Sequence, residues 1–127
     1  MEKISKLIEQ YTDTRFKIVS KTQGDNHFIN QTITIVPVNG SDMEIEVSLN
    51  DRGDISTVDS NRVKLKQFNI AEGYTQSEMA MGIAALLSGS YEVQNRNLFG
   101  RRTVIISVGN SKVYGVQVIS KTKPGKI

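Results

Sequence analysis

The residues between 91 and 102 carry the side chains best suited to recognition chemistry. This stretch holds three arginines, two asparagines, one glutamine and two aromatic residues. Arginine and asparagine form forked hydrogen bonds to phosphates and base edges, and aromatic rings stack on unpaired bases. The pattern predicts a polar binding loop, continued by a basic tail, with the expected binding residues Asn95, Arg96, Asn97, Phe99, Arg101, Arg102, Lys112, Lys121 and Lys123. The alternative is a solvated loop whose arginines pair with acids elsewhere while Phe99 packs in the core.

A second set of charged residues lies in and after the segment 42–49. The secondary acidic patch expected from it comprises Glu44, Glu46, Asp51 and Asp54. Carboxylates spaced along a strand could mimic the phosphates of a nucleic acid. Alternatively, Glu44 and Glu46 face Lys64 and Lys66 across neighbouring strands, where opposite charges stabilise a sheet modestly.

The residue types needed for catalysis and metal binding are sparse. The chain has one histidine, His27, and no cysteine. A catalytic histidine needs a nucleophile to activate and an acid to orient it, and the sequence does not place either beside His27. The oxygen-rich residues 50–61 lack the ligand spacing of a calcium loop and instead favour turns in which Asn and Asp bond their own backbone. We therefore expect no metal, no cofactor and no enzymatic activity.

Charge is sorted along the chain. Residues 91–127 contain seven Lys and Arg against one acid, whereas residues 1–90 contain nine against twelve, and the whole chain carries a formal net charge of +3. Such a division is typical of a surface that faces a charged partner.

The periodicity of apolar residues predicts a single α+β domain over residues 1–127, with a mostly antiparallel sheet, two helices and a C-terminal β-hairpin. The first helix is expected at about 2–12 and the second at about 76–88. Thr75 and Glu78 have the spacing of a capping box, and Gly89 lies where a left-handed C-terminal cap is expected. Gly82 would be tolerated inside the second helix if a strand backbone packs close to it. The tail 121–127 is expected to be flexible.

Two hairpins are expected from alternation. The strand 29–38 turns at Asn39-Gly40 and returns with the residues 43–49. In the C-terminal hairpin, Val104, Ile106 and Val108 alternate, as do Tyr114, Val116 and Val118. Pairing those two rows requires an odd connection, which predicts a three-residue loop at 109–111.

The turn Leu49-Asn50-Asp51-Arg52-Gly53, directly after a hairpin, resembles the Leu-x-Asp-x-Gly turn of an uncharacterised family of small bacterial and phage proteins. The resemblance covers about residues 29–60. It implies an accessory protein of a phage or mobile element and no particular site. Arg52 and Asp54 replace the acidic and aromatic residues more usual around that glycine.

These features predict a small, non-enzymatic binding protein that inhibits or regulates a nucleic-acid-processing complex by covering a surface. The partner would be a protein or a nucleic acid. One alternative is a protein that binds nucleic acid directly through its basic C-terminal third, and another is a small-ligand-binding or enzymatic domain. No apolar run is long enough for a membrane span, and no secretory signal is present, so a cytoplasmic location is expected. An exposed edge strand would allow a homodimer.

Overall fold

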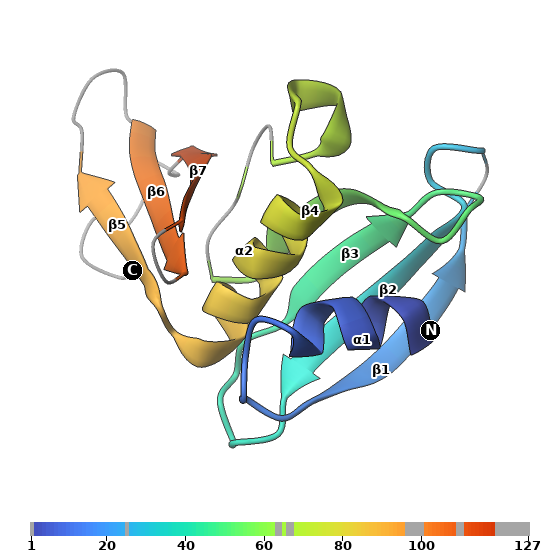
Figure 1. The fold of residues 1–127 in the computed structure, drawn as a ribbon, viewed down its shortest axis with the longest axis horizontal. Helices are drawn as coiled ribbons and strands as arrows, with labels where there is room; N and C mark the ends of the chain where they lie inside the picture. The colour runs from blue at the N-terminus through green and yellow to red at the C-terminus, as the bar shows by residue number, and fades with distance from the viewer. Residues whose placement is uncertain are drawn as a thin grey trace.

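The fold is described from a computed structural model, which covers residues 2–24, 26–62, 65, 68–95, 101–108 and 111–118. Two antiparallel sheets lie on either side of a central helix (Figure 1). The elements in chain order are α1 (Glu2–Glu9), β1 (Phe16–Gln23), β2 (Gln31–Pro37), β3 (Ile45–Leu49), β4 (Ile55–Ser60), the 3-10 helix η1 (Ile70–Glu72), α2 (Gln76–Ser88), β5 (Tyr91–Asn95), β6 (Arg101–Val108) and β7 (Ser111–Val118).

The N-terminal sheet has four strands in the order β1-β2-β3-β4. Apolar and polar residues alternate along its strands, because one row of side chains faces the helices and the other faces solvent. The buried row includes Met43, Ile45, Val47 and Leu49, as the sequence predicts, together with Ile33 and Ile35 of β2. The opposite face carries hydroxyl side chains, and Ser20 Oγ donates to Thr34 Oγ1 across β1 and β2 at 2.8 Å.

The outer edge of this sheet is formed by β1, whose last five residues are exposed. The register shifts between Ile18 and Ser20, which makes Val19 a bulge, and Val19 is half exposed. Bulges and lysines on an edge strand discourage pairing with another chain. Lys17 and Lys21 add that second feature to β1.

Helix α1 covers the β1 end of the sheet (Figure 1). Its apolar residues form one face, because Ile4 and Ile8 are buried and Leu7 and Tyr11 pack against the core. The helix ends at Glu9, before the predicted position 12. Tyr11 N donates to Ile8 O in a tighter turn, and Thr12 Oγ1 accepts from Thr14 N at 3.1 Å. These local bonds replace the next helical turn.

Helix α2 spans the predicted residues and has the predicted caps. Thr75 Oγ1 accepts from Glu78 N at 3.1 Å, and Glu78 Oε1 accepts from Thr75 N at 2.9 Å. Gly89 ends the helix with a left-handed φ of 76°. The helix contacts β2, β3 and β4 as well as β6 and β7. Contact with both sheets explains why it is apolar around much of its circumference.

An aromatic ring, and not a strand backbone, packs close to Gly82. The prediction of a close strand backbone at this glycine is therefore wrong. A Cβ at this position would meet the Phe68 ring, with Cε2 at 2.6 Å. Phe68 is 1% exposed and stacks edge-on against Tyr74, with ring centroids 4.7 Å apart. The absence of a side chain at Gly82 therefore makes room for Phe68, the largest fully buried side chain among the residues that the structure describes.

The connection between β2 and β3 is wider than the predicted tight turn. The last register pair is Ile35 with Ile45, so the return strand begins two residues after the predicted Met43. Local bonds shape the loop, since Ser41 N donates to Asn39 Oδ1 and Met43 N donates to Ser41 Oγ. Side chain–backbone turns of this kind compete with a two-residue hairpin.

The C-terminal sheet has the order β5-β6-β7 and differs from the sequence prediction in two ways. Residues 91–95, expected to be part of a loop, form β5. In the predicted C-terminal hairpin, Val108 pairs with Ser111, so two residues separate the strands instead of three. Val104 then pairs with Gly115, and Val116 pairs with Thr103, which places Val104 and Val116 on opposite faces. Val104, Ile106 and Val108 therefore pair with Gly115, Val113 and Ser111, and not with the row of Tyr114, Val116 and Val118 that parity predicted.

Candidate functional site

The structure places four of the nine predicted binding residues. Asn95 lies in β5, Arg101 and Arg102 lie in β6, and Lys112 lies in β7. The remaining five, which are Arg96, Asn97, Phe99, Lys121 and Lys123, lie outside the described residues. The arginines at 101 and 102 therefore belong to a strand and not to a loop, since β6 begins at Arg101.

The strand register brings some of these residues together and separates others. Asn95 pairs with Arg102, which in turn pairs with Gln117, so three hydrogen-bonding residues form one row across the sheet. Arg101 lies on the opposite face and pairs with Val118. Lys112 shares the face of Arg101 but pairs with Ser107, six positions along β6, which corresponds to about 20 Å of strand.

The strand register also relates the Asn95–Arg102–Gln117 row to Tyr91, at the other end of β5. Tyr91 pairs with Ile106, on the same face of β5 and β6 as Asn95 and Arg102. Tyr91 packs against the core that surrounds α2. The row lies at the other end of β5, four residues from Tyr91, and therefore near the end of the sheet.

The predicted acidic patch divides into two groups. Glu46 lies in β3 and pairs with Thr34 on one side and with Asp59 on the other. With Glu44 and the residues Ser60 and Asn61, these side chains line a hollow of about 250 Å³. Lys64 and Lys66, the alternative partners of these glutamates, lie outside the described residues. Glu46 and Asp59 are directly opposed like charges, an arrangement that costs stability.

The other two predicted acids belong to the turn between β3 and β4 and are tied to cations or histidine. Asp54 Oδ1 accepts from Lys3 Nζ at 2.6 Å, and Asp51 Oδ2 lies 3.0 Å from His27 Nδ1. The turn itself is organised by Asn50, whose Oδ1 accepts from the backbone N–H of Arg52 and Asp54 at 2.9 Å each. This confirms that the oxygen-rich segment is a backbone-bonded turn at Asn50.

His27 and Asp51 join two loops at the surface. Asp51 N donates to His27 O at 3.0 Å in addition to the side-chain contact, and the His27 side chain is 95% exposed. An acid that could orient the histidine is therefore present. Within the described ranges, no three His, Asp or Glu side chains gather in a way that could hold a metal ion.

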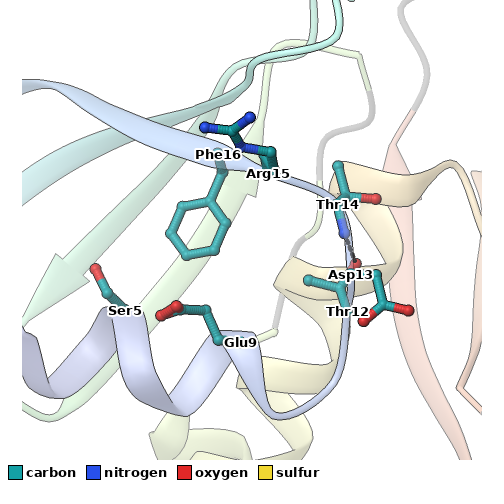
Figure 2. A pocket seen from close by; sticks show the side chains of 7 residues that line it. All are labelled: Ser5, Glu9, Thr12, Asp13, Thr14, Arg15 and Phe16. Carbon is teal, nitrogen blue, oxygen red and sulfur yellow. Dashed lines mark hydrogen bonds between the residues drawn. The ribbon is translucent and has the colours of Figure 1, made fainter.

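A hollow of about 490 Å³ opens between α1 and the start of β1, and the sequence analysis did not anticipate it. Its lining combines carboxylates, a guanidinium, hydroxyls and an aromatic ring, from Ser5, Glu9, Thr12, Asp13, Thr14, Arg15 and Phe16. Figure 2 shows the Phe16 ring pointing toward α1, with Ser5 and Glu9 rising from the helix beside it. The only sequence signal was the polar run Thr12–Arg15 directly after an amphipathic helix.

One tyrosine near the α2 N-terminus has altered acidity. Burial, and then the nearby carboxylates of Glu78 and Glu72, raise the pKa of the Tyr74 phenol. Both causes disfavour the phenolate, so the hydroxyl remains protonated.

Comparison with protein-family models, curated proteins and solved structures gave no match to this chain. The resemblance of the Leu49–Gly53 turn therefore stays a prediction. Among the described residues, no helix is both long and apolar enough to cross a membrane.

Proposed function

We propose that this protein is a small, non-enzymatic binding protein that regulates or inhibits a nucleic-acid-processing complex by covering a surface. The observation that carries the proposal is that the charge of the chain changes sign at the point where the second sheet begins. The charge changes sign near residue 91, with seven cations and one acid after it. The fold changes from one sheet to the other at the same point, because β5 begins at Tyr91.

The two sheets therefore differ in charge on opposite sides of α2 (Figure 1). The C-terminal sheet includes Arg101, Arg102 and Lys112. The N-terminal sheet carries both signs. Lys17 and Lys21 lie on its edge strand β1, whereas Glu46 and Asp59 lie opposite each other on β3 and β4, with the exposed Glu44 beside them. A molecule with this division orients itself in the field of a charged partner, and electrostatic steering accelerates its association.

The Asn95–Arg102–Gln117 row supports an anionic partner for the C-terminal sheet. Neighbouring strands are about 4.8 Å apart, so these residues are close enough to act on one ligand. Amide and guanidinium side chains form paired hydrogen bonds to carboxylates, phosphates and base edges. The same row would serve direct binding to nucleic acid, which is the main alternative.

The hollow between α1 and β1 favours a further alternative, a small-ligand-binding domain. Its lining offers both signs of charge beside an aromatic ring, which suits a small polar molecule with an apolar part.

A capture experiment with and without nuclease separates the first two functions. The tagged protein is used to capture partners from a lysate of its source cells, beside a variant with Arg101→Gln and Arg102→Gln and a control with Lys17→Gln and Lys21→Gln, which removes two exposed cations from β1. A protein that is retained after nuclease treatment by the parent and the control, but lost by the arginine variant, supports the proposal. Loss of every partner on nuclease treatment supports direct nucleic-acid binding, and equal capture by all three proteins refutes a role for the C-terminal cations.

A further inference from the structure

The sequence Asn39-Gly40 lies in the wide loop between β2 and β3, outside the hydrogen-bonded register of the sheet. It is the one Asn-Gly pair in the chain. Both residues are exposed, and an added Cβ at Gly40 would meet no atom within 4 Å. No neighbouring atom therefore crowds the Gly40 backbone.

We propose that Asn39 is a site of spontaneous deamidation in the folded protein. The deprotonated backbone nitrogen of Gly40 attacks Cγ of Asn39, the bond from Cγ to Nδ2 breaks, and ammonia leaves. The product is a five-membered succinimide. Water then opens either of its two carbonyl–nitrogen bonds and yields aspartate or isoaspartate at position 39. The net reaction consumes one water and releases one ammonia, and it requires no other reactant.

The local geometry supports the attack. The nucleophile must be an amide nitrogen whose N–H is not held in a backbone ladder. In the part of the chain that the structure describes, no hydrogen bond is made by Gly40 N–H. The Asn39 side chain already lies beside the backbone that follows it, because its carbonyl oxygen accepts from Ser41 N at 3.1 Å. Glycine also gives the backbone the freedom that ring closure needs.

Asn50, in the turn between β3 and β4, shows how the fold protects another asparagine. Asn50 is only 8% exposed, whereas Asn39 is exposed. Its neighbour Asp51 donates its own N–H to His27 O, so that nitrogen is engaged. We expect Asn50 to keep its amide while Asn39 loses it.

The modification would change charge and shape at one end of the N-terminal sheet. The new carboxylate lowers the formal net charge of +3 by one. It lies three residues before Asp42 and five before Glu44, and so adds a third carboxylate to this stretch of the chain. Isoaspartate also lengthens the backbone, which would disturb the turn that positions Ser41 and the buried Met43.

The test is incubation of the full-length protein in neutral buffer, followed by trypsin digestion and fragment-ion mass spectrometry. Trypsin releases residues 22–52 as one peptide, which contains Asn26, Asn30, Asn39 and Asn50 and so compares all four. We expect Asn39 to show the increase in mass that accompanies conversion of an amide to a carboxylate before the other three asparagines do. The modified protein should also carry one more negative charge on ion exchange and be labelled by an isoaspartate methyltransferase.

The Asn39→Gln variant is the matched control, because it keeps an amide and cannot form the five-membered ring. It should lose both the charge shift and the labelling. An unmodified Asn39 in the folded protein, over a time in which the free peptide 22–52 deamidates there, would overturn the proposal. Modification of all four asparagines at equal rates would also overturn it.

Discussion

At the scale of single residues, Gly82 and Phe68 pack tightly against each other in the core. A methyl group at position 82 would come within 2.6 Å of Phe68 Cε2, and Phe68 is enclosed by the core, with only 1% of it exposed. We expect Gly82→Ala to destabilise the protein by about 1–3 kcal/mol through overpacking, although alanine is the better helix former. Chemical denaturation measures this change.

A double-mutant cycle provides the control for that prediction. Phe68→Leu removes the ring atoms that a Cβ at position 82 would meet. In this background, Gly82→Ala should be neutral or stabilising. An equal loss of stability in both backgrounds would show that Phe68 is not the reason for glycine at this position.

The cap of α2 is a second prediction at this scale. Thr75→Ala removes the acceptor of the Glu78 N–H, and we expect a loss of about 1 kcal/mol and a melting temperature lower by several degrees. Thr75→Ser keeps the hydroxyl and should be nearly silent. Equal losses from the two variants would mean that the threonine methyl group, and not the hydrogen bond, stabilises the helix end.

Hydrogen bonds between residues close in the sequence could be predicted from the sequence alone. The capping box of Thr75 and Glu78 and the Asn50 turn depend on residues within four positions, and both are present. The contact of Gly82 with Phe68 joins residues 14 positions apart, so the sequence showed only that something must lie close. The hollow beside Phe16 escaped prediction for the same reason, because α1 and β1 create it together.

At the scale of elements, the strand register of the C-terminal hairpin differs from the one predicted from parity. Parity predicted that Val104 and Val116 face each other, whereas the register pairs Val104 with Gly115 and Thr103 with Val116. A strand slip of one residue moves every side chain to the other face. The strand β5 was missed because Tyr91–Asn95 is mostly polar, and its pairing with β6 overrides that composition.

Introduced cysteines test this register in a chain that has none of its own. Thr103→Cys with Val116→Cys places two thiols on directly opposed residues, within the Cα separation of about 4.4–6.8 Å that a disulfide needs. We expect this pair to form a disulfide on mild oxidation, detected by mass spectrometry without alkylation. The pair Val104→Cys with Val116→Cys should stay reduced. The reverse result would restore the three-residue loop.

At the scale of the whole molecule, α2 separates two sheets of different charge. Their side chains need not touch for this to matter, because the field of a charged surface extends about 8–10 Å at physiological salt. A partner with one sign of charge would therefore meet this protein in a preferred orientation. The division was visible in the sequence as a change of sign near residue 91, but its coincidence with the start of the second sheet required the structure.

The most direct measurement of the central claim is competition between this protein and nucleic acid for the captured complex. A fluorescent nucleic acid bound to that complex is titrated with the parent protein and with the Arg101→Gln, Arg102→Gln variant. We predict displacement by the parent, weakening as salt rises, and a loss of displacement by the variant without a change in its melting temperature. Equal displacement by both proteins, or binding of the parent to the free nucleic acid instead of the complex, would contradict the account.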